Sequence, residues 1–236
     1  MNNKYLQMTR ALTAAAVLVG LAGCAGVNKA PEVTHDGLVE IDSKAFATVY
    51  EKPGASVAGY NQFAVTDCQV SFRKNWLRNQ NDSRMGLGNR VTKEDMDKIR
   101  ESLASMCNDE FIGVLKSDSA YKLVGAEQVN NETLLLKPSI INLDVAAPDV
   151  QSAGRSQSYT TDSGEMTLFL EVADASTGEV LYRVVDRRRD SGSGRLQWTN
   201  SVTNAADAKR VLGGWGKQLR EGLDRVVAEQ KGSSAN

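Results

Sequence analysis

Histidine is almost absent from this chain of 236 residues, which has one histidine and three cysteines. The single histidine, His35, precedes the first strong secondary-structure pattern. Neither a Ser-His-acid triad nor a histidine-bearing metal site can therefore form inside the folded domain. An excess of one charge is also lacking, because 28 Lys and Arg residues accompany 29 Asp and Glu residues. A near-neutral chain with few aromatic residues is not expected to bind nucleic acid.

The chain also lacks a hydrophobic run of the roughly twenty residues needed to span a bilayer. Its most apolar run, Ala11 to Leu21, is about half that length and follows the basic residues Lys4 and Arg10. The run ends in Leu21-Ala22-Gly23-Cys24, which resembles the lipobox of bacterial lipoproteins. This order predicts a lipoprotein signal peptide over residues 1–23 and a lipid on the thiol of Cys24. The alternative is an ordinary secretory signal with an incidental cysteine.

Lipid attachment would place the protein in the bacterial envelope. Residues 24–60 are then the lipidated N-terminus and a tether, which prolines and glycines such as Pro31 and Pro53 interrupt. Two or more acyl chains anchor a protein stably to a membrane. Alanine follows Cys24, and by resemblance to lipoprotein sorting in Gram-negative bacteria the absence of aspartate there favours the outer membrane. We therefore expect an outer-membrane anchor and a domain in the periplasm.

The remaining cysteines, Cys68 and Cys107, form an even pair in an oxidising compartment. A bridge between them would close a loop of about 40 residues, which the chain-entropy model values at about 4 kcal/mol. It would also require Cα atoms within about 7 Å of each other. The alternative is two small buried hydrophobic residues, and the sequence leaves both interpretations open.

Hydrophobic periodicity divides the rest of the chain into elements. Gln62 to Phe72 is predicted as one strand, and the polar stretch Arg73 to Arg90 as a loop. Its Gly86-Leu87-Gly88 lacks the spacing of a nucleotide-binding loop, so no cofactor is predicted. Thr92 then caps a helix with Asp95 three residues on, and apolar residues recur at helical spacing as far as Leu115.

The second half predicts a sheet followed by a helix. Pro138 places the segment Thr133 to Val145 at a sheet edge or at a bulge. Met166 to Ala173 and Val180 to Arg187 form a hairpin whose turn contains Gly178. Ala205 to Gln230 is an amphipathic helix. Its three central glycines predict close approach of another backbone, and they are Gly213, Gly214 and Gly216.

These elements predict an α+β fold, with a mainly antiparallel sheet of about five strands and two amphipathic helices packed on one face. The predicted single periplasmic domain covers residues 61–230, and residues 231–236 form a disordered tail.

Several motifs resemble the bacterial lipoproteins grouped as domain of unknown function 3313. The most specific is the strand end Val184-Val185-Asp186-Arg187-Arg188. Others are Met166–Glu171, Ser176–Val180, Trp198, the helix around Trp215, Leu219–Leu223, Lys137–Asp144, Pro148–Ser156, Lys52–Gly54 and Gly59-Tyr60. The resemblance extends from about Leu38 to Val226 and implies a compact envelope domain. It implies no activity, substrate or catalytic residue.

Two surfaces are candidates for binding a partner. The first is the segment Ala147 to Gly164, whose length is unusual for a compact domain unless it is functional or disordered. Within it, Arg155 and Tyr159 are of the types enriched in binding hot spots. The second is the basic strand end Arg187, Arg188 and Arg189, which is either a solvated tip or a contact for anionic lipid or an acidic partner.

The residues favour a non-catalytic envelope module that binds another envelope protein. One alternative is a carrier of a small ligand or lipid, which needs an apolar cavity of several hundred Å³ between helices and sheet. Another is a hydrolase that works without histidine through two carboxylates in a cleft. The carboxylates near predicted strands are Asp144, Glu165, Glu171 and Asp186.

Overall fold

The computed structural model describes residues 31–82, 90–117, 121–145, 158–160, 164–189, 197–199 and 201–233. These residues form a mixed eight-stranded sheet, a separate two-stranded sheet and three α-helices. The strands are β1 (Val39–Ile41), β2 (Thr48–Glu51), β3 (Gln62–Val65), β4 (Gln69–Phe72), β5 (Lys122–Leu123), β6 (Thr133–Val145), β7 (Ser158–Thr160), β8 (Gly164–Asp174), β9 (Val180–Arg189) and β10 (Gln197–Thr199). The helices are α1 (Trp76–Asp82), α2 (Lys93–Lys116) and α3 (Ser201–Ser233), with a 3₁₀ turn at Ala126–Gln128.

The expectation of about five mainly antiparallel strands and two helices is wrong. The large sheet runs β1-β2-β9-β8-β6-β3-β5, and β4 also pairs with β6. Both β3 and β4 run parallel to β6, because the chain crosses over through α1 and α2 before it returns beside them. The predicted single strand Gln62–Phe72 is thus two strands with Cys68 between them.

The N-terminal edge of the sheet comes from residues that the sequence places with the tether. Strand β1 pairs with β2, and β2 pairs with β9. At the other end of the chain, α3 continues to Ser233, into the predicted tail, while residues 234–236 lie outside the described residues.

The stretch Arg73 to Arg90, predicted as a loop, contains helix α1. Trp76 is its one buried residue and stacks on Phe72 with ring centroids 4.3 Å apart. The indole of Trp76 also donates a hydrogen bond to the carbonyl of Val145. A short helix held by one tryptophan has no repeating apolar face, so its sequence carries no helical period.

Pro138 lies in a central strand, so the prediction of an edge or a bulge at this residue is wrong. It is opposite Leu170 of β8. On the other side of β6, β3 ends opposite Leu136, and β4 begins opposite Ser139. Proline has no N–H to donate, and here it occupies the interval between two partner strands. The bulge instead lies around Asn142, which has a positive φ of 52°.

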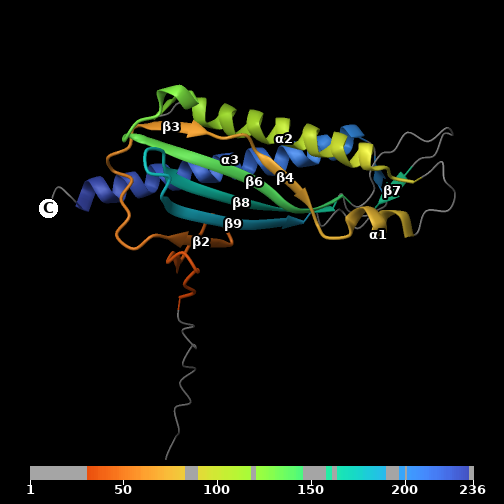
Figure 1. Ribbon diagram of the computed structural model, residues 1–236, viewed down its shortest axis with the longest axis horizontal. Coiled ribbons are helices and arrows are strands. Elements are labelled where there is room, and N and C mark those ends of the chain that lie inside the picture. Colours follow the sequence, from red (N-terminus) through yellow and green to blue (C-terminus); the bar gives the residue numbers. More distant parts are fainter. Residues whose placement is uncertain are drawn as a thin grey trace, which may run out of the picture. The chain divides into compact units, whose positions relative to one another are not determined.

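Helices α2 and α3 cover one face of the large sheet (Figure 1), and their buried residues join those of the strands in one core. The predicted capping box of Thr92 and Asp95 is confirmed at the start of α2. A Cβ on Gly216 would lie 3.2 Å from the side chain of Val114, and one on Gly213 would lie 2.9 Å from that of Glu110. The predicted approach of another backbone is confirmed at Gly216 alone, where the carbonyl of Glu110 lies 3.6 Å from the Cβ position. Gly213 meets only a side chain, and Gly214 has open space.

A disulfide joins the sheet to the helical layer. Cys68, between β3 and β4, is bonded to Cys107 of α2, and their Cα atoms are 6.1 Å apart. Both residues are buried in the core. The bridge therefore fixes α2 over the parallel part of the sheet.

Candidate functional site

A cavity of about 560 Å³ lies between the two long helices and the sheet. The N-terminal halves of α2 and α3 form its sides, and residues at one end of β6, β8 and β9 line it from the sheet. Its apolar lining consists of Ile99, Leu103, Met106, Leu143, Val145, Met166, Ala205, Ala208 and Val211. This volume falls within the usual range for small-molecule sites.

The cavity begins where close contact between the helices ends. The two helices run in the same direction, because residues later in α3 contact residues later in α2. Gly213 lies beside Glu110, Gly216 lies beside Val114, and Arg220 donates a hydrogen bond to the carbonyl of Ser117. Cavity-lining residues of α2 and α3 all precede these contacts, reaching only Met106 and Val211. The glycines therefore bring the C-terminal parts together, and larger side chains surround a void toward both helix N-termini.

Arg188 lines the cavity from β9 and is held in place by a buried carboxylate. Its Nε donates to Oδ2 of Asp186 at 2.7 Å, and its Nη2 donates to Gln218 at 3.3 Å. Asp186 is 3% exposed and also accepts from the indole of Trp215 at 2.6 Å and from the backbone N–H of Ala47 at 2.9 Å. This chain of contacts fixes the orientation of the Arg188 guanidinium.

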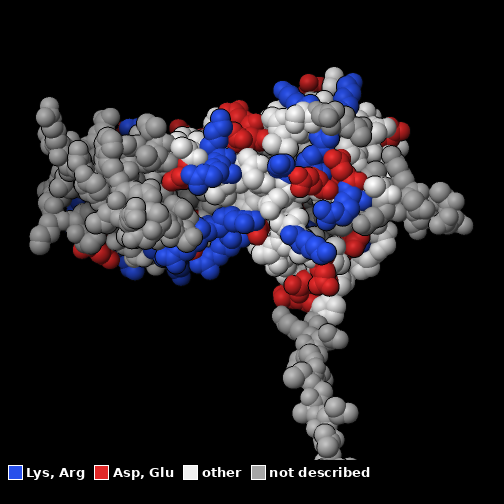
Figure 2. All heavy atoms as spheres, turned by 180° about the vertical axis from the view of Figure 1, so that it is seen from behind, with Lys and Arg blue, Asp and Glu red and all other residues white. Residues whose placement is uncertain are grey.

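Other charged residues around the cavity have partners within the protein. Asp95 accepts hydrogen bonds from the backbone and hydroxyl of Thr92, which lower the pKa of its carboxyl. Lys98 pairs with Glu94, and this contact raises the pKa of its ammonium. On α3, Arg210 pairs with Asp207. Figure 2 shows basic side chains gathered beside the undescribed residues at the end of the domain where β9 finishes.

The carboxylates predicted for paired catalysis do not converge in the cavity. Asp144 and Glu165 border it and lie opposite each other in the β6–β8 register. Glu165 is four residues from Phe169 on β8, so it shares the face of the sheet opposite the helices. There Glu165 pairs with Arg187, and Asp144 pairs with Arg73 at 3.1 Å.

The other two predicted carboxylates have separate positions. Asp186 anchors Arg188, and Glu171 lies on the helix-free face, where it accepts from Arg183. Among the residues with described placement, no group of His, Cys, Asp and Glu could hold a metal ion.

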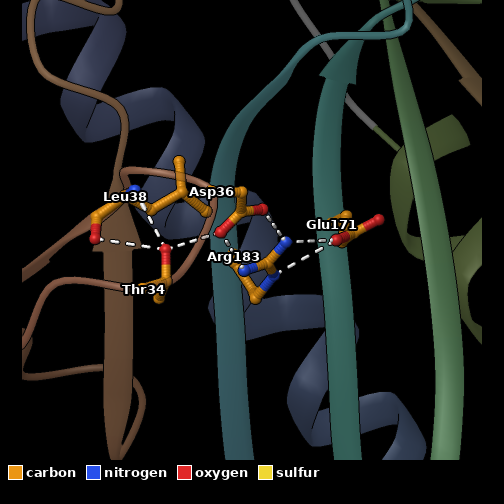
Figure 3. A network of polar contacts seen from close by, with 5 residues as sticks. All are labelled: Thr34, Asp36, Leu38, Glu171 and Arg183. Carbon is orange, nitrogen blue, oxygen red and sulfur yellow. Dashed lines mark hydrogen bonds and ion pairs between the residues drawn. The ribbon is translucent and has the colours of Figure 1, made fainter.

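Arg183 also ties the N-terminal segment to the sheet (Figure 3). It donates to both carboxylate oxygens of Asp36, at 3.0 and 2.6 Å, and to Glu171 at 2.7 Å. Its guanidinium lies 5.5 Å from the ring centroid of Phe169. Hydrogen bonds from Arg183 and Thr34 hold the pKa of Asp36 well below its ordinary value, and those to Asp36 and Glu171 raise the pKa of Arg183. This network fixes where the N-terminal segment joins the domain.

The predicted partner surface is described only in part. Arg155 lies outside the described residues. Tyr159 is in β7, opposite Trp198 of β10, and its side chain also falls outside the description. In the basic strand end, Arg187 pairs with Glu165, while Arg188 and Arg189 border the cavity.

The cavity was not predicted from the sequence, although parts of its lining were. Ile99, Leu103 and Met106 belong to the predicted apolar face of α2, and Val211 to that of α3. An apolar face indicates burial but not whether its neighbours fill the space. The spacing of Asp186 and Arg188 on one strand face was the available signal for the anchored arginine.

The model of DUF3313, a protein family of unknown function, matches residues 33–219. The chain belongs to this family. The resemblance to domain of unknown function 3313 is thereby confirmed, while the family match does not bear on the predicted lipid anchor. No curated protein is significantly similar to the chain. No helix within the described ranges is both long and apolar enough to cross a membrane.

Solved structures show remote similarity to the chain. A Xanthomonas campestris protein of family DUF330 is 13% identical with a TM-score of 0.40, and the match covers 86% of this chain and 97% of that one. The PelC dodecamer of Paraburkholderia phytofirmans is 14% identical with a TM-score of 0.34, covering 74% and 99%. A putative neuraminyllactose-binding hemagglutinin homolog from Helicobacter pylori is 8% identical with a TM-score of 0.31, covering 77% and 93%. At these scores the function of this DUF3313 member has to be argued from its own geometry.

Proposed function

We propose that this DUF3313 member is a lipid-anchored, non-catalytic binding protein of the bacterial envelope, and that its ligand site is the cavity between α2, α3 and the sheet. The observation that supports a ligand site is the cavity of about 560 Å³ with nine apolar lining residues. Such a cavity is the feature by which a small-ligand or lipid carrier differs from a module that binds only through its surface.

The lipobox-like Leu21-Ala22-Gly23-Cys24 supports the anchor, and Ala25 supports the outer membrane as its location. The test is Cys24→Ser in intact cells. We expect the variant to lose acyl label, to stay unprocessed, and to lose the wild-type membrane fractionation. Unchanged processing and unchanged membrane association would reject the lipid anchor.

Ligand binding is tested by filling the cavity. The probe is N-phenyl-1-naphthylamine, an apolar dye that fluoresces in apolar surroundings, added to the full chain in nanodiscs. Ala208→Trp places an indole in the cavity lining, while Ala228→Trp adds the same group at an exposed position of the same helix. We expect Ala208→Trp to abolish the protein-dependent fluorescence and Ala228→Trp to keep it. Equal fluorescence in both variants would contradict the cavity as ligand site.

A surface for an envelope protein partner is a separate part of the proposal. It rests on the composition of Ala147–Gly164 and on Arg155 and Tyr159 within it. The double change of Arg155 and Tyr159 to Ala is expected to abolish crosslinking to that partner in cells while leaving the melting temperature unchanged. Unaltered crosslinking would reject this surface.

A further inference from the structure

We infer that the cavity takes a single-chain amphiphile, with its aliphatic tail against the apolar lining and an oxyanion head, carboxylate or phosphate, on the guanidinium of Arg188. This inference rests on the proposed function, because it names the ligand class of the same cavity.

The apolar part of the ligand follows from the lining. Ile99, Met106, Met166 and Val211 are only half-buried, although they pack against the buried core. They present aliphatic and thioether groups without aromatic rings, and methionine adapts to flexible hydrocarbon. A ligand that covers these side chains removes their apolar surface from water, which favours a hydrocarbon chain.

The head group follows from Arg188. In the described contacts of its guanidinium, Nε donates a hydrogen bond to Asp186 and Nη2 donates one to Gln218. The Arg188 side chain is 44% exposed. Asp186 orients the group and is itself fixed by Trp215. A planar guanidinium that is already oriented loses little entropy when its remaining N–H groups bind an oxyanion. Carboxylate and phosphate share the acceptor geometry that matches this donor.

The other charges that line the cavity balance one another, so the preference for an anion rests on Arg188. The bases in the lining are Lys98, Arg188, Arg189 and Arg210, and Lys98 is itself paired with Glu94. The acids on the helical sides are Asp95, which is engaged in the capping box of Thr92, and Asp207, which is paired with Arg210. Asp144 and Glu165 pair with arginines outside the lining, on the far face of the sheet.

The directions of the two helices also favour an anion. Helices α2 and α3 run parallel, and each contributes its N-terminal half to the cavity. The N-terminal end of a helix carries a partial positive charge, so two such ends lie toward the cavity. This contribution supplements the anchored arginine.

The experiment uses photoreactive diazirine analogues of palmitate, lysophosphatidic acid and hexadecanol, with equal chain lengths. The full chain is held in phosphatidylcholine nanodiscs, and the labelled peptides are identified by mass spectrometry. We expect the two anionic probes to label peptides that contain Met106 or Met166 at least about tenfold more than hexadecanol does. The ratio between carboxylate and phosphate probes shows which of the two heads the site prefers.

Variants assign the effect to Arg188. Arg188→Gln is expected to reduce anionic labelling to the level of hexadecanol, and Arg188→Lys to give an intermediate level, because lysine keeps the charge but loses the planar donor. Arg187→Gln is the matched control, since Arg187 is adjacent on β9 but does not line the cavity. It should label like the wild type. Melting temperatures of all variants check folding, and Arg188→Lys keeps the test informative if Arg188→Gln is unstable.

The outcomes separate this inference from the proposed function. If hexadecanol labels the cavity as strongly as palmitate and lysophosphatidic acid do, the oxyanion site is wrong while the apolar ligand site stands. The same conclusion follows if Arg188→Gln and Arg188→Lys both label like wild type. If no probe labels the cavity peptides, or if Ala208→Trp leaves labelling unchanged, the proposed function fails as well.

Discussion

The indole N–H of Trp215 donates to the carboxylate of Asp186 across 2.6 Å, in a contact that is buried on both sides. It links the middle of α3 to the strand that carries Arg188 at the cavity. A hydrogen bond to a charged group contributes about 1.5–3 kcal/mol, which is more than a bond between neutral groups contributes. The contact therefore serves both the stability of the domain and the geometry of the candidate site.

Removal of this donor is expected to destabilise the protein. Trp215→Phe should lower the free energy of unfolding by about 2–4 kcal/mol, combining the lost hydrogen bond with a small loss of packing. Trp76→Phe is the control, because its indole donates to the neutral carbonyl of Val145 at 3.3 Å and should cost less. Urea unfolding measures both. Equal losses in the two variants would contradict a special contribution from Asp186.

The Arg183–Asp36 pair predicts a loss of stability in acid. Because the pKa of Asp36 in the folded protein lies below its ordinary value of 3.8, the unfolded chain binds a proton first as the pH falls. The stabilisation is fully present above about pH 4 and declines at lower pH. Unfolding curves at pH 7 and pH 3 should show a smaller difference for Asp36→Asn than for the wild type. Asp174 keeps part of the difference, since hydrogen bonds from Ser176 and Tyr60 also lower its pKa.

Reduction of the disulfide is expected to loosen α2 from the sheet. The bridge spans 39 positions between Cys68 and Cys107, and the chain-entropy model gives about 4 kcal/mol for a loop of this size. The double variant Cys68→Ala and Cys107→Ala should lose stability of this order, measured by urea unfolding in oxidising buffer. In a reducing buffer the wild type should approach the double variant. A wild type that is equally stable in both buffers, with its thiols shown to be reduced, would contradict this expectation.

The glycines of α3 should differ in their response to alanine. Gly214→Ala gains helix propensity without a clash and should stabilise the protein by about 0.5–1 kcal/mol. Gly216→Ala gains the same propensity but places its Cβ 3.2 Å from Val114, so its gain should be smaller or reversed. Chemical denaturation of the two variants compares them directly. A larger gain at Gly216 than at Gly214 would refute close packing between α2 and α3.

Local patterns predicted the hairpin and the long helices. In the hairpin, the alternation of Leu168 and Leu170 indicates a strand, and Gly178 indicates the turn that follows it. Both signals lie within one short segment of the chain. The capping box of Thr92 and a repeated apolar face likewise predict helix α2. Such signals act between residues that are close in sequence, which is why they can be interpreted without the fold.

The sheet as a whole and the cavity depend on distant contacts. Strands β1 and β5 have three and two residues, too few to show a period, and they exist because neighbouring strands offer an edge. Parallel pairing of β3 with β6 joins segments about seventy positions apart. The cavity is the space between α2, α3 and the sheet on the N-terminal side of the close contact at Gly216. No local sequence pattern encodes the size of this space.

The edge position of β1 and β2 determines how the domain would respond to mechanical load on its N-terminus. Tension that enters at Pro31 reaches the Arg183–Asp36 ion pair and then two strands of three and four residues. Peeling these strands from β9 would release the chain up to Lys52, about 70 Å when extended, while the disulfide-closed remainder stays folded. The edge of the sheet would thus lengthen the N-terminal segment under load without unfolding the rest of the domain.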